Sequence, residues 1–146
     1  MAAPTVVADI MTRDVLSLSE EDNLEDIAQR MERFSLRHMP VVDGSRLVGL
    51  ITHRDILRLA VSELTDEPAV QQARQRRLVE NTFVAKVMTR NPLTVRPQTP
   101  IVEAAEMLVR SKFGCLPVVE DEGKLVGIVT EHDFMKLLVA LLKRDS

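Results

Sequence analysis

The chain has 146 residues, 45% of them hydrophobic, which is enough to bury a core without disulfides or a structural metal. Its 19 lysines and arginines against 22 aspartates and glutamates leave a net charge of -3, which excludes a strong field for nucleic acid or an anionic membrane. A single cysteine excludes an internal disulfide, and no apolar run approaches the roughly 20 residues that span a bilayer. We therefore expect a soluble, cytoplasmic protein.

Residues 7–18 are predicted to form an irregular segment that ends in a short strand at residues 15–18, where apolar and polar residues alternate. We call this first segment of a repeat its lead. The same pattern returns at residues 84–95, and Met-Thr-Arg occurs in both, at residues 11–13 and 88–90. A recurrence of this length indicates an internal repeat, which organises the rest of the chain.

A helix is predicted after each of these segments. Asp22 is expected to cap the first helix, and Thr99, followed by Pro100, is expected to cap the second. Apolar residues then recur at helical spacing, so each helix presents one apolar face to a core. These residues are Leu24, Ile27, Ala28, Met31 and Phe34 in the first helix, and Ile101, Ala104, Ala105 and Leu108 in the second.

Two strands joined by a tight turn follow in each repeat. The first of them opens with a proline-containing segment, residues 37–42 and 114–119, and the second covers residues 46–51 and 124–129. A charged, helix-favouring stretch at residues 65–81 connects the repeats.

The pattern Gly-x-x-Thr-x-x-Asp stands at residues 49–55 and again at residues 127–133. Its apolar pair is typical of the end of a buried strand, and its threonine is typical of the cap of a following helix. Such a helix start has four backbone N–H groups without helical partners and carries the positive end of the helix dipole, so it attracts anions. The same residues also fit a capping box, with aspartate in place of the usual glutamate or glutamine.

The predicted fold is therefore α/β (α+β), with two βαββα repeats packed about a pseudo-twofold axis. The first repeat covers residues 7–64, the helical connection residues 65–82, and the second repeat residues 83–143. One repeat of this size is too small to be stable alone. The last helix is apolar on nearly all sides over residues 134–142, so we predict that it is buried in a homodimer.

These pieces, in this order and present twice, resemble the cystathionine-beta-synthase (CBS) domain, a family whose members occur as tandem pairs. The matching segments are residues 9–12, 37–43 and 49–55 in the first repeat, and residues 87–89, 116–119 and 127–133 in the second. The resemblance implies a CBS domain pair that acts as a stand-alone sensor of energy or metabolites. Its expected ligand is AMP, ADP, ATP or a related adenosyl compound, bound in clefts between the two motifs, and its expected partners are a second copy and a separate effector protein.

The resemblance also implies a role for particular residues. In the family the aspartate of Thr-x-x-Asp holds the ribose hydroxyls, which here implies Asp55 and Asp133. Phosphate contacts are implied for Thr52, Thr130, Arg54, His132, Arg37 and His38. Adenine-lining positions are implied for Leu16, Leu93, Leu50 and Ile128. The chemistry agrees, because an ionised carboxylate accepts hydrogen bonds from vicinal hydroxyls, and a helix start with Arg or His complements phosphate.

Two other classes of function stay open. The chain is alternatively a structural or partner-binding dimer without a ligand, in which the motif only caps helices. An enzyme is the weakest class, since no nucleophile with its base and no P-loop lysine is present, and no catalytic residues or cofactor are predicted. The three histidines have no metal-ligand spacing, so no metal site is predicted, and Cys115 is interpreted as a small buried hydrophobe.

Overall fold

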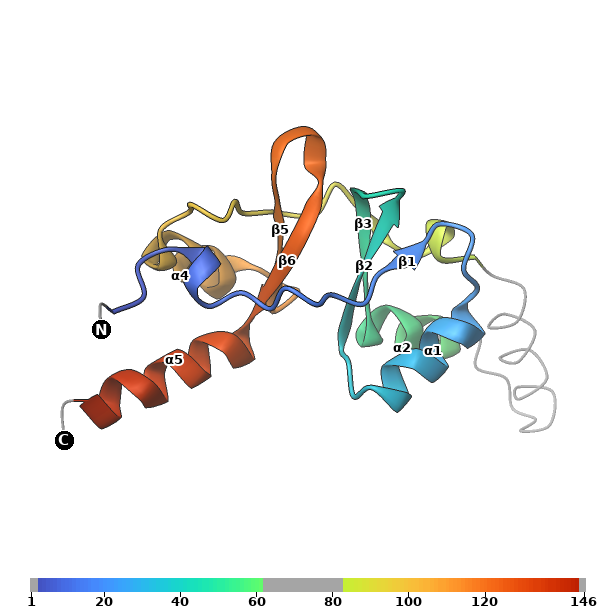
Figure 1. The fold of residues 1–146 in the computed structure, drawn as a ribbon. Helices are drawn as coiled ribbons and strands as arrows, with labels where there is room; N and C mark the ends of the chain where they lie inside the picture. Colours follow the sequence, from blue (N-terminus) through green and yellow to red (C-terminus); the bar gives the residue numbers. More distant parts are fainter. Residues whose placement is uncertain (1–2, 62–82, 145–146) are drawn as a thin grey trace. The chain divides into compact units, whose positions relative to one another are not determined.

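A computed structural model describes residues 3–61 and 83–144, and its elements follow the order predicted for two repeats (Figure 1). The first repeat contains β1 (Leu18–Ser19), α1 (Leu24–Arg33), β2 (His38–Asp43), β3 (Arg46–Thr52) and α2 (His53–Val61). The second contains β4 (Thr89–Arg90), α4 (Ile101–Arg110), β5 (Cys115–Val119), β6 (Leu125–Thr130) and α5 (Glu131–Arg144). Short 3-10 turns lie at Val7–Asp9, Val84–Lys86 and Asp121–Gly123. The mixed fold of helices and strands is confirmed, whereas the predicted connection at residues 65–82 lies outside the described residues.

The first strand of each repeat is shorter than predicted. The strand expected at residues 15–18 is wrong in its bounds, because only Leu18–Ser19 pairs, in parallel with Val41 and Val42 of β2. In the second repeat the equivalent contact is a single parallel bridge between Val95 and Val118.

The predicted helix caps are one residue too early. The cap of α1 is Asn23, whose side chain accepts from the Asp26 N–H, and α4 follows Pro100. Asp22 instead accepts from the Ser19 N–H, and Thr99 accepts from the Arg96 N–H. These side chains close a turn before the helix rather than capping it, a competition typical of Asp and Thr.

The chain divides into two compact units, and each contains the lead of the other repeat. The central unit comprises Leu16–Gly44 and Val48–Asn91, and the terminal unit comprises Met1–Val15, Ser45–Leu47 and Pro92–Ser146. The sheet of the central unit has the order β1-β2-β3-β4, so the lead of the second repeat supplies its last strand. In the terminal unit Thr12 and Ile128 exchange two backbone hydrogen bonds of 2.9 Å each. The leads are thus exchanged between the repeats.

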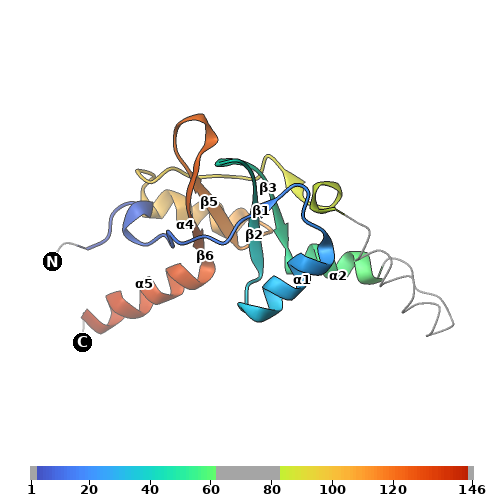
Figure 2. The same cartoon turned by 45° about the vertical axis from the view of Figure 1, so that its right-hand side comes forward.

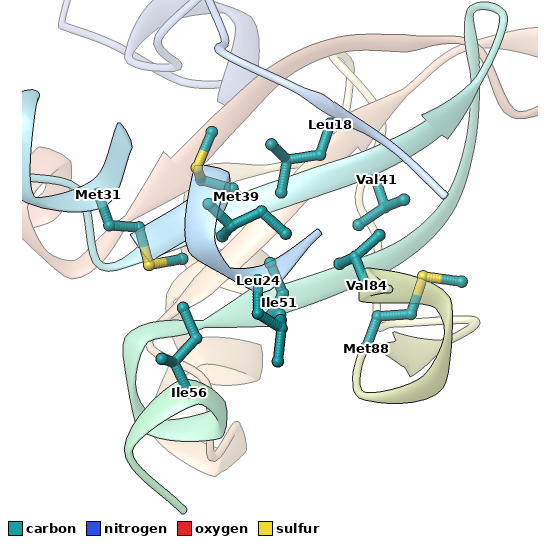
Figure 3. Packing of buried hydrophobic residues seen from close by; sticks show 10 residues of the cluster. Leu18, Leu24, Met31, Met39, Val41, Ile51, Ile56, Val84 and Met88 are labelled. Atoms are coloured by element: carbon teal, nitrogen blue, oxygen red, sulfur yellow. The ribbon is translucent and has the colours of Figure 1, made fainter. Parts of the chain in front are cut away.

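In the central unit α1 and α2 lie side by side along β1, β2 and β3 (Figures 1 and 2). The predicted apolar face of α1 enters the core through Leu24, Ile27 and Met31, while Phe34 is about half exposed, at 49%. Figure 3 shows Leu24, Ile51 and Val84 among the buried side chains of this cluster. Val84 belongs to the lead of the second repeat, so the exchanged segment is part of the core.

The terminal unit has a matching core between α4, the β5–β6 hairpin and the first lead. Its buried members are Val7, Met11, Val95, Ala104, Leu108, Leu116, Val118 and Val129. None of the helices in the described part of the chain combines the length and the apolar character needed to cross a membrane.

Each lead crosses a strand of the other repeat at a glycine. A Cβ atom on Gly127 would lie 2.9 Å from the Met11 Sδ and 2.9 Å from the Thr12 carbonyl oxygen. A Cβ atom on Gly49 would lie 2.5 Å from the Met88 Sδ and 3.1 Å from the Thr89 carbonyl oxygen. Both distances are too short for a side chain, so the motif glycine is required by close approach of the backbones.

Replacing Gly127 by alanine should therefore destabilise the protein by about 1–3 kcal/mol, because the Thr12 carbonyl is held in its backbone pairing and cannot move away. Urea unfolding measures this loss. Gly44→Asn is the control: Gly44 has a φ of 64 and open space around it, and asparagine tolerates that conformation, so a change within about 0.5 kcal/mol is expected. Equal stability of Gly127→Ala and the unmodified protein would contradict the close crossing.

Candidate functional site

Both copies of Gly-x-x-Thr-x-x-Asp lie where a strand passes directly into a helix. Thr52 ends β3 and Thr130 ends β6, and each threonine precedes the first residue of a helix, α2 or α5. The apolar residues before the threonine anchor the strand in the core, since Ile51 and Val129 are fully buried. The predicted junction is therefore confirmed in both repeats.

The threonine and the aspartate form the same reciprocal capping box in each copy. In the first, the Asp55 Oδ2 accepts from the Thr52 N–H at 2.9 Å and from the Thr52 hydroxyl at 3.0 Å. The Asp55 N–H donates to the Thr52 hydroxyl oxygen at 3.2 Å. The corresponding distances between Thr130 and Asp133 are 2.9, 3.2 and 3.3 Å. The capping interpretation is confirmed, and aspartate performs it in place of glutamate.

The residue just before β2 and the residue just before β5 each accept a hydrogen bond from a further helix N–H. The His53 N–H donates to the Arg37 carbonyl at 2.8 Å, and the Glu131 N–H donates to the Gly114 carbonyl at 3.1 Å. Gly114 has a φ of 71, a conformation that favours glycine. The segments at Arg37 and Gly114 are thereby held beside the helix starts.

These bonds correct the expectation of four free backbone donors at each helix start. Three of the four N–H groups at each helix start have acceptors within the protein. The fourth, that of Arg54 in the first copy and of His132 in the second, has no hydrogen-bond partner among the described residues. An anion at either motif thus meets one free N–H rather than four. The charged side chains must supply most of any attraction.

The basic candidates have unequal exposure. Arg37, Arg54 and His132 are exposed, whereas His38 is half-buried in β2 and has interactions of its own. An exposed arginine side chain can reorient towards an anion without breaking an interaction with a buried group.

The apolar candidates fall into two kinds. Leu50 and Ile128 are 1% and 8% exposed, yet they lie outside the hydrophobic clusters of their units, because neighbours along a strand point to opposite faces. Leu16 and Leu93 are 45% and 55% exposed. The structure therefore separates the strand residues at the motif from two exposed leucines on the leads.

The two aspartates differ in their surroundings, and sequence reasoning missed the residues responsible. Asp55 is half-buried, whereas Asp133 is only 5% exposed. The Thr12 hydroxyl donates to the Asp133 Oδ1 at 3.5 Å, and the Lys136 Nζ lies 3.7 Å from the same oxygen. The recurrence of Met-Thr-Arg marked Thr12 as part of the repeat, but its spacing gave no sign of this contact.

In the described part of the chain, no three His, Cys, Asp or Glu side chains lie together in a way that could hold a metal ion. Cys115 is buried, and its burial, together with the smaller effect of the Glu131 carboxylate, raises the pKa of its thiol to about 12. The thiol is protonated at neutral pH and is a poor nucleophile, in agreement with the predicted role as a buried hydrophobe.

The model of one protein family, described as the CBS domain, matches residues 7–62 and again residues 84–140. The chain belongs to the CBS domain family. The resemblance drawn from the repeated motifs is thereby confirmed, and the chain is a CBS domain pair by sequence.

Three relatives are similar over most of this CBS domain pair. MJ1225 of Methanocaldococcus jannaschii is 34% identical over 131 residues, 90% of this chain, and the chain spans 46% of that relative's length. The crystal structure of CBSX2 from Arabidopsis thaliana matches with a TM-score of 0.80 at 28% identity, covering 99% of this chain and 100% of CBSX2. CBSX2 has also been solved in complex with AMP, with a TM-score of 0.76.

The third relative is the CBS domain pair of MJ0100, solved in complex with 5'-methylthioadenosine and S-adenosyl-L-methionine. It matches with a TM-score of 0.76 at 25% identity and covers 94% of this chain and 98% of that one. Compounds that contain adenosine thus occupy two of the three relatives.

The raised pKa of Cys115 predicts a pH dependence of stability. The folded value of about 12 lies above the ordinary value of 9.0, so the folded state retains the proton longer. This contribution is fully present below about pH 9 and is lost as the pH rises from there towards 12. Between pH 7 and pH 10 the free energy of unfolding should therefore fall by about 1 kcal/mol more in the unmodified protein than in Cys115→Ala. Urea unfolding of both proteins at pH 7 and pH 10 measures the difference, and identical losses would refute the assignment.

Proposed function

We propose that this CBS domain pair is a regulatory module that binds an adenosine-containing ligand at its Thr-x-x-Asp motifs. The observation that carries the proposal is the capping geometry. In both repeats the aspartate Oδ2 accepts the hydrogen bonds of the helix cap, and these bonds hold the carboxylate in place at a strand–helix junction. At Asp55 the second oxygen, Oδ1, has no partner among the described residues and is available to a ligand.

A ribose fits this arrangement. An ionised carboxylate oxygen accepts hydrogen bonds from vicinal hydroxyl groups without a donor of its own to satisfy. Leu50 and Ile128, buried outside the cores of their units two residues before the motif threonines, offer apolar contact to an adenine ring. We assign the exposed Leu16 and Leu93 to the same contact, because each belongs to a lead that approaches a sheet.

Phosphate groups, where the ligand has them, are assigned to the basic side chains and the remaining donors. Arg54 and His132 each contribute a free backbone N–H as well as a side chain, and Arg37 lies beside the start of α2. His38 and the threonines Thr52 and Thr130 complete the assignment. AMP bound to CBSX2 and the adenosyl compounds bound to MJ0100 support an adenosine-containing ligand for this chain as well.

Regulation then requires that the ligand bind one arrangement of the protein more tightly than another. No reaction is proposed, and the signal passes to a separate effector protein. The function is that of an energy or metabolite sensor, whose ligand is AMP, ADP, ATP or a related adenosyl compound.

Replacing Asp55 and Asp133 together by alanine should abolish binding, and each single change should weaken it about 10- to 100-fold at its own motif, the effect of losing hydrogen bonds to a charged group. Calorimetric titration with AMP, ADP, ATP and S-adenosylmethionine measures affinity and stoichiometry.

Two controls make this experiment specific. Asp43→Ala removes an exposed carboxylate of β2 outside the motif and should leave binding unchanged. Asp55→Asn keeps an oxygen for the Thr52 N–H, so weak binding by this variant separates loss of ligand contact from loss of the helix cap. Undiminished binding by the double alanine variant would refute the site.

The second candidate function, a dimerisation or partner-binding module, is favoured by α5. Its large apolar side chains remain exposed, with Met135 at 58%, Leu138 at 48% and Leu142 at 62%. An apolar surface of this kind on one helix is typical of an interface. We propose that a second copy of the chain covers it, which is compatible with ligand binding.

The double change Leu138→Lys and Leu142→Lys should convert a dimer into a monomer, because both residues lie on one face of α5 and two buried charges cannot be accommodated there. Sedimentation equilibrium measures the mass. Val109→Lys on α4 is the control, since Val109 is 86% exposed and no change is expected. A monomeric unmodified protein at micromolar concentration would argue against the interface.

A further inference from the structure

The two motifs share their capping bonds but not the surroundings of the second carboxylate oxygen. At Asp133, Oδ1 accepts from the Thr12 hydroxyl at 3.5 Å and lies 3.7 Å from the Lys136 Nζ. At Asp55 the described residues place no donor on Oδ1. The oxygen that a ligand needs is therefore engaged in one motif and open in the other.

The difference arises from position rather than from residue type. The repeat places Thr89 where the first lead has Thr12, and Arg58 where α5 has Lys136. Among the described residues neither Thr89 nor Arg58 bonds to Asp55. Similar side chains thus occupy the equivalent positions in both repeats, but they contact the aspartate Oδ1 only at Asp133.

Thr12 is held firmly where it contacts Asp133. Its N–H and its carbonyl both pair with Ile128 at 2.9 Å, two residues before Thr130. The neighbouring Met11 packs on Gly127 with no room for a further carbon atom. The backbone of Thr12 cannot withdraw, so a ligand hydroxyl reaches the Asp133 Oδ1 only by turning the Thr12 side chain away.

We infer that Thr12 is a specificity-determining residue that competes with the ligand for Asp133, so that the Asp55 motif fills first and the Asp133 motif fills with lower affinity. This inference rests on the proposed function. Lys136 also competes with a ribose for the Asp133 Oδ1, but its side chain is 65% exposed, and an exposed ion pair is weak in water. The competition therefore depends mainly on the Thr12 hydroxyl.

Two single-motif proteins test the inference by calorimetric titration with AMP. Asp133→Ala leaves only the Asp55 motif, and Asp55→Ala leaves only the Asp133 motif. We expect the protein with only Asp55 to bind AMP about tenfold more tightly. Adding Thr12→Val to the protein with only Asp133 should tighten binding about threefold, the effect of removing one competing neutral hydrogen bond.

Matched variants identify the hydroxyl as the cause. Thr12→Ser retains the hydroxyl and should behave as threonine does, whereas Thr89→Val in the protein with only Asp55 should leave the affinity unchanged. Thermal melting of each variant establishes that it is folded.

The outcomes separate this inference from the proposed function. If Thr12→Val weakens binding or leaves it unchanged, or if both single-motif proteins bind equally tightly, the competition is refuted while nucleotide binding stands. The competition is also refuted if the protein with only Asp133 binds no AMP, whether threonine or valine stands at position 12. If the unmodified protein binds none of the four adenosyl ligands, the proposed function itself fails.

Discussion

The crossing of each lead over a strand of the other repeat governs the rest of the structure. At Gly127 and Gly49 the two backbones approach so closely that a single methyl group would collide with a methionine sulfur and a carbonyl oxygen. The methionines at these crossings, Met11 and Met88, are themselves core residues. A repeat of about fifty residues buries too little surface to be stable alone, so the exchanged lead supplies core that neither repeat has by itself. Because each crossing lies three residues before a motif threonine, it also positions the start of the following helix.

In the Thr-x-x-Asp motif the two oxygens of the aspartate carboxylate have different roles, one in the helix cap and the other in the proposed ligand contact. Oδ2 stabilises the helix start by accepting from the N–H and the hydroxyl of the threonine, and Oδ1 takes no part in these bonds. Structural and proposed binding roles therefore belong to different atoms of the same side chain. The cap also limits how far the helix dipole can serve an anion, because most of the N–H groups that would face it already have acceptors. Charge on the flanking arginines therefore becomes more important than the dipole.

The accuracy of the sequence predictions varied with the range of the interactions involved. The helices, the hairpins and the two strand–helix junctions were predictable, because periodicity, turn residues and a threonine cap are local signals. The helix caps at Asp22 and Thr99 were wrong by one residue, because each side chain found an N–H in the preceding turn. The capping box was predictable as an alternative, but the satisfaction of three of the four helix donors was not, since one acceptor is a carbonyl from the segment just before another strand.

The sequence by itself determined the repeat, the order of the elements, the family and the residues of both motifs. These follow from patterns a few residues long that recur along the chain. Only the tertiary structure decided which lead packs with which repeat, and that the Oδ1 of Asp133, but not that of Asp55, is contacted by a threonine of a lead. The reason is the distance along the chain: Thr12 and Asp133 are 121 residues apart, and their contact depends on how the whole chain is connected rather than on any local pattern.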